Sequence, residues 1–129
     1  MVSVVISIGS NCGHREEAIH KALTWLSDIL KDFRFSDIYE TPPAGNSTSR
    51  YLNCVAAGIY PGNGNDLQKL CKTFERESGR NEECRKTGSV PIDIDIVVAG
   101  DIVLKPWDYR QEFFLKGYWK IGQPYSNNQ

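Results

Sequence analysis

The chain has 129 residues, of which 40% are hydrophobic and 24% are charged, and its formal net charge is −1. This length and balance predict one globular domain over residues 1–129, with a core that needs neither a metal nor a disulfide to hold it together. The near-zero charge argues against a nucleic-acid binder, and no apolar run approaches the roughly 20 residues that cross a bilayer.

The first half of the chain alternates between strand-like and helix-like patterns. A Val/Ile-rich stretch at 2–8 predicts a buried strand, and apolar residues at helical spacing predict an amphipathic helix over 15–31. Aromatic and apolar residues from 33 to about 41 predict a second strand, which Pro42 and Pro43 end. A Gly/Asn/Ser-rich loop over 44–50 precedes a third strand at 51–60.

The second half repeats the alternation. A second helix is expected to begin at Asp66, which is a plausible N-cap. A polar loop over 79–89 leads to a fourth strand at 92–98, with a short strand at 102–104 after it. An apolar, aromatic segment over 113–121 closes the domain, and 122–129 reads as a frayed tail.

The element order, β-α-β-β-α-β, is that of a ferredoxin-like plan. We therefore expect an α+β fold with an antiparallel sheet, both helices on one face, and a short C-terminal appendage. This plan hosts many unrelated functions, so the function has to be argued from side chains. Four cysteines without metal-site spacing and no export signal predict reduced thiols and a cytoplasmic location.

Two aspartates in the fourth strand are the sharpest feature. Asp93 and Asp95 alternate with isoleucines, so they share one face of the strand, roughly 6–7 Å apart at about 3.3 Å per residue. Two adjacent carboxylates repel each other, which favours a compensating cation. Mg²⁺ suits such a pair, because it is often held by one or two carboxylates together with waters and phosphate oxygens. The alternative is a solvated face of an edge strand.

Two further features are weaker. Arg80, Arg85 and Lys86 are loop cations just before the aspartates, which could close over polyphosphate, although Glu82 and Glu83 between them favour an ordinary solvated loop. The amide of Asn53 could pair with a planar heterocycle, helped by Thr41 and by stacking of Tyr51 or Phe113. The alternative is structural, with Asn53 in the sheet and Phe113 in the core.

Five short stretches, in this order and at these spacings, resemble the 6-hydroxymethyl-7,8-dihydropterin pyrophosphokinase family over about residues 6–121. They are Gly9-Ser10-Asn11, Tyr39-x-Thr41-Pro42-Pro43, Tyr51-Leu52-Asn53, Gly79-Arg80 and Ile92-Asp93-Ile94-Asp95-Ile96. No single stretch is diagnostic, but their joint order is specific.

The resemblance implies transfer of the β,γ-pyrophosphoryl group of ATP to the hydroxymethyl oxygen of a reduced pterin, giving AMP, in folate biosynthesis. It implies two Mg²⁺ ions held by Asp93 and Asp95, with Arg80 closing on the reacting phosphates. The implied partners are ATP and the pterin, with no nucleic acid and no membrane, and the expected state is a monomer.

The resemblance also implies the residues that bind each substrate. On the pterin side these are Thr41, Pro43, Ala44, Tyr51, Asn53 and Phe113. On the nucleotide side the candidates are Glu75, Lys86, Ile96 and Arg110, and Arg110 lies close to a position where the family carries an arginine.

The chain departs from the family pattern on the nucleotide side. Val90 and Glu82 stand where arginines are usual, Thr87 replaces a tryptophan, and the segment around Pro106-Trp107 is shortened. Arg85, Lys86, Lys105 or Arg110 are candidates to replace the missing arginines. Two alternatives remain at this stage. One is a degenerate homologue that binds pterin or nucleotide without fast catalysis. The other is a single-strand RNA binder, which the net charge and the absence of an RRM aromatic signature oppose.

Overall fold

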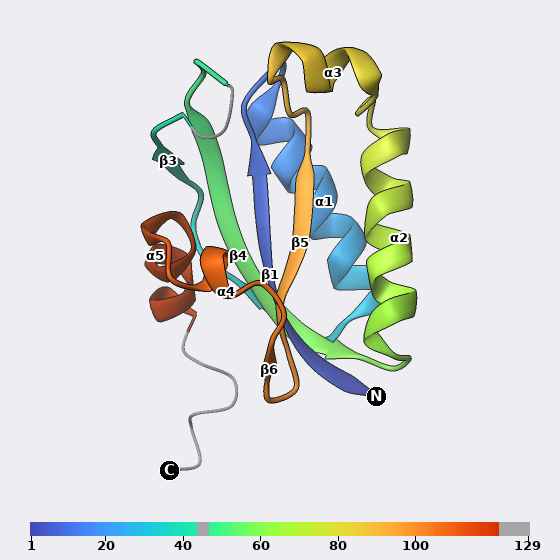
Figure 1. The fold of residues 1–129 in the computed structure, drawn as a ribbon. Helices are drawn as coiled ribbons and strands as arrows, with labels where there is room; N and C mark the ends of the chain where they lie inside the picture. Colours follow the sequence, from blue (N-terminus) through green and yellow to red (C-terminus); the bar gives the residue numbers. More distant parts are fainter. Residues whose placement is uncertain (44–46, 122–129) are drawn as a thin grey trace.

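The computed structural model describes residues 1–43 and 47–121. These residues form one antiparallel sheet in the order β2-β4-β1-β5-β6, with β3 also paired to β4 (Figure 1). The strands are β1 (Val2–Ser10), β2 (Lys31–Phe35), β3 (Tyr39–Thr41), β4 (Tyr51–Tyr60), β5 (Asp93–Ala99) and β6 (Ile102–Val103). The predicted α+β, ferredoxin-like plan is confirmed.

Two long helices cover one face of the sheet and the C-terminal segment covers the other (Figure 1). The long helices are α1 (Arg15–Ile29) and α2 (Gly64–Glu77), and Trp25 and Phe74 stack between them with ring centroids 4.7 Å apart. The shorter helices are α3 (Glu82–Thr87), α4 (Pro106–Tyr109) and α5 (Glu112–Lys120). Among the described helices, none is long and apolar enough to span a membrane.

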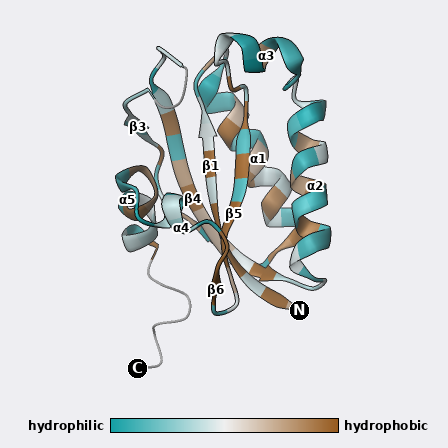
Figure 2. Ribbon diagram, viewed as in Figure 1, coloured by the Kyte–Doolittle hydropathy of each residue, from teal (hydrophilic) through white to brown (hydrophobic). Residues whose placement is uncertain are grey.

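Side-chain alternation along the strands divides the core into two layers. Val4, Ile6 and Ile8 of β1 pack with α1 and α2, whereas Val5 packs with Phe114 of α5 on the opposite face. The strands are accordingly hydrophobic along much of their length and the outward surfaces of the helices are hydrophilic (Figure 2). The same alternation puts Ile94 in the helix layer and turns the aspartates of β5 toward the α5 side.

The stretch predicted as one strand over 33–41 forms two short strands. Ser36 interrupts them: its backbone N–H donates to the Val55 carbonyl at 2.8 Å, and its Oγ accepts from the Val55 N–H at 3.0 Å. One buried serine thus satisfies both backbone groups of Val55 where the strand breaks. A hydrophobic pattern does not reveal that a side-chain hydroxyl takes the place of a backbone acceptor in the hydrogen-bond ladder between two strands.

Two other boundaries differ from the predictions. Asn63, not Asp66, caps α2, because its side chain accepts from the Asp66 N–H at 2.9 Å. The predicted loop over 79–89 contains helix α3, capped by Asn81 and ended by Gly88 in a left-handed conformation with φ 73°. None of the α3 residues is buried, so no apolar periodicity marks the helix in the sequence. The predictions for 44–46 and 122–129 lie outside the described residues.

Helix α5 approaches the sheet at a glycine. A Cβ on Gly117 would come within 2.6 Å of Val55 Cγ2 and 2.8 Å of the Tyr39 hydroxyl. We expect Gly117→Ala to lower the free energy of unfolding by about 1–3 kcal/mol, because overpacking outweighs the better helix propensity of alanine. Urea denaturation of both proteins measures this difference.

The matched control is Gly64→Ala at the start of α2, where an added Cβ meets nothing within 4 Å. This variant is expected to change the free energy of unfolding by less than about 1 kcal/mol, in the stabilising direction. An equal decrease in the free energy of unfolding of the two variants would contradict the view that Gly117 is needed for the close contact with β4.

Candidate functional site

A cavity of about 580 Å³ lies between the α5 side of the sheet, the β3 region, α4 and α5. We call it the aromatic cavity. Five of the six residues predicted to bind a pterin line it: Thr41, Pro43, Tyr51, Asn53 and Phe113. The sixth, Ala44, lies outside the described residues. Asp93 lines the same cavity, so the site brings together motifs from four separate parts of the chain.

The polar groups of this cavity come from adjacent strands. Asn53 and Thr41 are both buried, and the Asn53 amide nitrogen donates to the Thr41 hydroxyl. A Cβ on Gly9 of β1 would lie 2.9 Å from the Asn53 side-chain oxygen. Glycine at this position therefore leaves room for the amide, whose oxygen can accept and whose second N–H can donate a hydrogen bond to a planar ligand.

Aromatic side chains form the walls. Tyr51 projects from β4 and Phe113 from α5, and Trp107 of α4 adds a third ring, 6.1 Å from that of Phe113. Tyr39 fixes α5 to the sheet, because its hydroxyl donates to the Phe113 carbonyl and accepts from the Gly117 N–H at 3.2 Å. Burial raises the pKa of Tyr39, so this hydroxyl stays protonated and able to donate.

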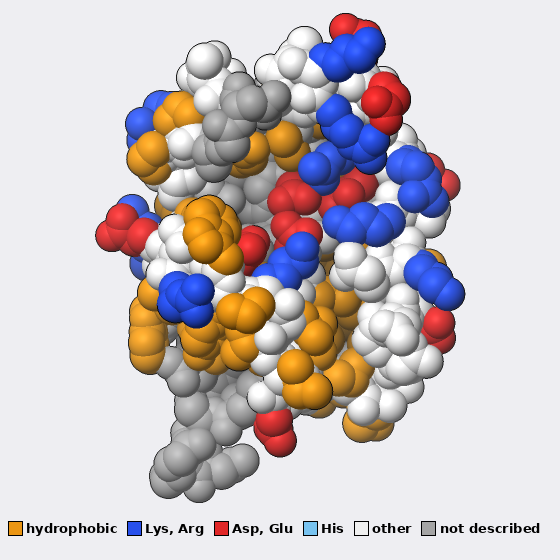
Figure 3. Space-filling view, in the orientation of Figure 1, with side chains coloured by type: hydrophobic (Ala, Val, Ile, Leu, Met, Phe, Trp, Pro, Cys, Tyr) orange, Lys and Arg blue, Asp and Glu red, His pale blue; other side chains and the backbone are white. Residues whose placement is uncertain are grey.

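A group of six charged side chains lies at the mouth of the cavity, and we call it the ionic cluster. Figure 3 shows acidic side chains gathered at the centre of this face, bordered by basic ones. Arg80 Nη1 lies 2.7 Å from Asp93 Oδ1 and 3.1 Å from Glu75 Oε1. Lys105 Nζ and Lys72 Nζ lie 3.4 and 3.6 Å from Asp95 Oδ1. The members are Lys72, Glu75, Arg80, Asp93, Asp95 and Lys105.

The two aspartates differ in their electrostatic surroundings. Burial and the neighbouring carboxylate raise the pKa of Asp93, and Arg80 opposes this rise only in part. Burial acts in the same direction on Asp95, but the hydrogen bond with Asp93 and the charges of Lys105 and Lys72 bring its pKa below the usual value. The two carboxylates therefore differ in how readily each carries its negative charge, and added positive charge beside them would favour the ionised form of both.

Glu75 has a structural task within this cluster. Its carboxylate is buried in the last turn of α2, where Oε2 accepts the Ile94 backbone N–H at 2.7 Å. Strand β6 pairs only with Val98 and Ala99, so this part of the outer edge of β5 has no strand partner among the described residues. Glu75 supplies the acceptor that a neighbouring strand would provide and ties α2 to the edge of the sheet.

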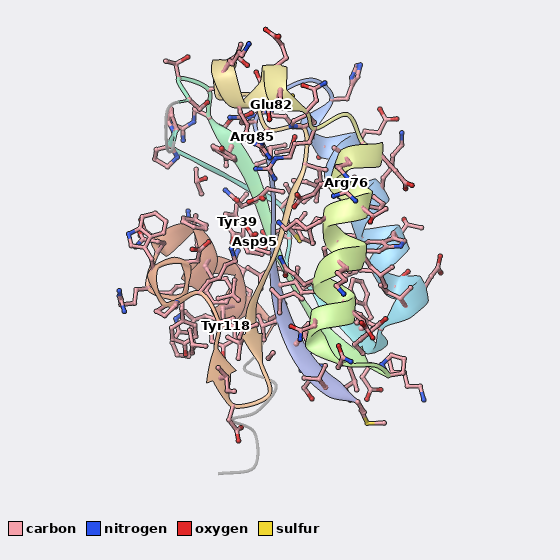
Figure 4. All side chains as sticks on the ribbon, turned by 45° about the vertical axis from the view of Figure 1, so that its right-hand side comes forward. Tyr39, Arg76, Glu82, Arg85, Asp95 and Tyr118 are labelled. Atoms are coloured by element: carbon pink, nitrogen blue, oxygen red, sulfur yellow. The ribbon has the colours of Figure 1, made fainter. Side chains whose placement is uncertain are left out.

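A second cavity of about 620 Å³ lies on the other side of the ionic cluster, between α2 and α3. We call it the cationic cavity. Four of its lining residues are basic: Lys72, Arg76, Arg80 and Arg85. In Figure 4, Asp95 on β5 lies near the centre of the view, Arg76 on α2 lies to its upper right, and Glu82 and Arg85 on α3 lie above. Glu82 accepts from Arg85 at 2.5 Å in an exposed ion pair within α3.

The remaining predicted residues lie farther from the two cavities. Lys86 is exposed on α3, and Arg110 is exposed at the end of α4; neither lines a cavity. The Ile96 side chain is buried in the helix layer, so only its backbone, two residues along the same edge of β5 from Ile94, can meet a ligand.

Sequence reasoning missed two parts of the site. Asn11 links the end of β1 to the segment after α3, because Nδ2 donates to the Gly88 carbonyl at 2.9 Å and Oδ1 accepts the Val90 N–H at 2.6 Å. The motif that contains Asn11 is visible in the sequence, but no sequence pattern shows that this side chain contacts residues 77 and 79 positions away. Lys72 was missed because a half-exposed lysine on a helix resembles any solvated one.

The two aspartates can bind a hard divalent cation only when other ligands complete its coordination shell. Among residues 1–43 and 47–121, no three His, Cys, Asp or Glu side chains are placed to hold a metal ion together. Asp93 and Asp95 supply two carboxylates on one face of β5. Mg²⁺ accepts such a set when phosphate oxygens and waters complete its shell. The donor set therefore fits a metal that arrives with a phosphorylated ligand.

Comparison with known proteins gives one family. Residues 5–123 match the family model described as 7,8-dihydro-6-hydroxymethylpterin-pyrophosphokinase. A protein of Aquifex aeolicus named 2-amino-4-hydroxy-6-hydroxymethyldihydropteridine pyrophosphokinase is 31% identical over 124 residues, which cover 89% of this chain and 77% of that protein. A protein of the same name from Porphyromonas gingivalis is 35% identical over 104 residues, covering 76% and 69%.

A third relative is much longer than this chain. A folate synthesis bifunctional protein of Arabidopsis thaliana is 34% identical over 99 residues, which cover 75% of this chain and 20% of that protein. The matched region is therefore about a fifth of that relative's length.

The edge contact of Glu75 makes a stability prediction. Glu75→Ala is expected to lower the free energy of unfolding by about 2–4 kcal/mol, because it leaves the Ile94 N–H without its acceptor and removes a buried partner of Arg80. Glu75→Gln is expected to cost less, since it keeps an acceptor for Ile94. The exposed Glu77→Ala, on the same helix, should change the value by less than about 0.5 kcal/mol. Equal losses for the alanine and glutamine variants in urea denaturation would contradict this role for the acceptor.

Proposed function

The chain belongs to the 7,8-dihydro-6-hydroxymethylpterin-pyrophosphokinase family, and we propose that it transfers the pyrophosphoryl group of ATP to 6-hydroxymethyl-7,8-dihydropterin with the help of Mg²⁺. In this reaction the hydroxymethyl oxygen forms a bond to the β-phosphorus of ATP and loses its proton. The bond between that phosphorus and the oxygen bridging to the α-phosphorus breaks, and AMP leaves with that oxygen.

The position of Asp93 and Asp95 between the two cavities carries the proposal. Asp93 lines the aromatic cavity, while its partner Arg80 lines the cationic cavity. Asp95 contacts Lys72, which also lines the cationic cavity. A planar ring on one side and a polyphosphate on the other would meet at these carboxylates. Phosphoryl transfer requires this kind of arrangement, since it depends on positioning and on neutralisation of charge.

The aromatic cavity has the chemistry expected for a pterin. Asn53 and Thr41 offer donors and acceptors in the plane that an amide-bearing ring requires, and Tyr51 and Phe113 offer faces for stacking. A ring held there would direct its substituent toward Asp93, the one ionic-cluster member that lines this cavity. The hydroxymethyl group would then lie next to the metal-binding carboxylates.

The cationic cavity suits the nucleotide. Arg80 is placed to neutralise charge on the transferred phosphates, because it already holds one carboxylate of the pair. The open edge of β5 near Ile94 and Ile96 offers backbone groups to a base, and Glu75 keeps α2 against that edge. Asp93 and Asp95 would hold the Mg²⁺, which would supply Lewis-acid stabilisation of the charge on the phosphates. Cytoplasmic location and a monomeric state remain predictions from the sequence.

The first test is an assay for AMP with 6-hydroxymethyl-7,8-dihydropterin, ATP and Mg²⁺. AMP should appear only when the pterin is present, and EDTA should abolish it. Asp93→Asn and Asp95→Asn should each lower the rate by on the order of 10³, because a neutral amide is a poor ligand for Mg²⁺. Asp101→Asn, at an exposed turn beyond the end of β5, should leave the rate unchanged.

The melting temperatures of the three variants would show that the fold is kept. Full activity in both site variants would exclude the metal assignment. A folded wild-type protein that binds the pterin but yields no AMP would instead support the degenerate homologue. That alternative draws on Glu82 and Val90, which stand where the family usually carries arginines.

The aromatic wall makes a separate prediction. Phe113→Leu should weaken pterin binding by about 10-fold or more, because stacking on a heterocyclic ring contributes roughly 1–3 kcal/mol. The affinity of the Phe113→Leu variant for a non-hydrolysable ATP analogue with Mg²⁺ should not change, since Phe113 does not line the cationic cavity. Isothermal titration calorimetry measures both, and the exposed Trp119→Leu on α5 is the matched control. A similar loss for both ligands would mean that α5 has shifted.

A further inference from the structure

Asp95 is the only carboxylate of the ionic cluster that two lysines reach at the same atom. Lys72 of α2 and Lys105, which precedes α4, approach Asp95 Oδ1 at 3.6 and 3.4 Å. They come from elements on opposite sides of β5, since α2 packs on the helix layer and α4 on the other face. Neither residue belongs to the stretches that carry the family resemblance.

We propose that Lys72 and Lys105 are exchanging cations: they hold Asp95 while the metal position is free, and they move to phosphate oxygens when a divalent cation takes that carboxylate. This inference rests on the proposed function for the identity of the phosphorylated ligand. The chemical class of that ligand is a polyphosphate bound together with a divalent cation.

The two lysines are able to move. Their side chains are 37% and 39% exposed, whereas the Asp95 side chain is 12% exposed, so the two lysine side chains are more open to solvent than the carboxylate that they contact. Lysine carries a compact charge on a flexible stem with three donors, which can leave one oxygen and contact another nearby. Lys72 also contacts Glu75 at 3.2 Å and lines the cationic cavity, where phosphates would lie.

The charge balance of the ionic cluster gives the exchange a direction. Three cations face three carboxylates, so the cluster carries at least as much positive as negative charge, whether or not Asp93 holds a proton. A divalent cation alone would add two positive charges and would compete with both ammonium groups for Asp95. A polyphosphate removes this excess, so metal and anion should each favour binding of the other.

This mechanism predicts opposite effects of one substitution on two ligands. Lys105→Ala or Lys72→Ala removes a competitor for Asp95, so Mn²⁺ alone, used as a probe for Mg²⁺, should bind about 3-fold to 10-fold more tightly. The same variants lose a charged donor to phosphate, so a non-hydrolysable ATP analogue with Mg²⁺ should bind about 10-fold more weakly. Each single variant leaves Asp95 with its other lysine, so the fold should persist.

The measurements are calorimetric titrations with Mn²⁺ and with the ATP analogue, together with melting temperatures. Lys69→Ala on α2 and Lys120→Ala on α5 are matched controls, because both lysines are exposed and neither contacts the ionic cluster. These controls should change neither affinity. Lys105→Arg should restore part of the affinity for the analogue, because it returns the positive charge.

The outcomes separate this inference from the proposed function. Weaker binding of both ligands by the alanine variants would mean that the lysines only position Asp95. Unchanged affinity for both ligands would mean that the lysines have no role. Both results overturn the inference. If the wild type forms AMP but these shifts are missing, the proposed function stands alone. If the opposite shifts appear without pterin-dependent AMP, the exchange stands and the proposed reaction fails. A wild type that binds neither Mn²⁺ nor the analogue also overturns the inference.

Discussion

The bond from the Ile94 N–H to the buried Glu75 carboxylate is the contact on which the site depends. Strand β5 needs an acceptor on its open edge, and α2 needs a fixed position against that edge. One carboxylate meets both needs, but its burial then requires cations. Lys72 and Arg80 supply them, and these same cations reach on to Asp95 and Asp93. The charges that hold α2 against the sheet and the charges of the candidate site therefore form one network.

That network explains why acidic residues can gather at the open edge of the sheet, on β5. Each aspartate would be costly alone, because burial disfavours its charged form. Arg80 comes from the segment between α2 and α3 and Lys105 from the segment before α4, so different parts of the fold share the compensation. The carboxylates remain near solvent and near both cavities. A site of this kind is assembled by packing of the layers, not by one loop.

Much of the fold and part of the site follow from local pattern. Alternation along β5 predicts that Asp93 and Asp95 share a face, and helical spacing predicts α1 and α2, because both signals depend on neighbours a few residues apart. The partners of the aspartates do not follow in this way. Lys72 lies 23 positions before Asp95 in the sequence, and only the approach of α2 to the edge of β5 makes it a partner. Helix α3 escapes prediction for a related reason, since it buries none of its residues.

The residues that the sequence resemblance predicts to depart from the family pattern lie in or next to an exposed helix. Glu82 and Thr87 belong to α3, an exposed helix whose ends are closed by Asn81 and Gly88. Val90 follows this helix, and its backbone, not its side chain, is what Asn11 holds. Substitutions there leave the core and the Glu75 contact intact, so they can change affinity for an anion without unfolding the protein. The aromatic cavity is different, because Asn53 and Thr41 are buried between strands and any change there would disturb the sheet. Burial thus divides the site into a half built on strands, whose polar side chains are buried, and a half built on α3, none of whose residues is buried.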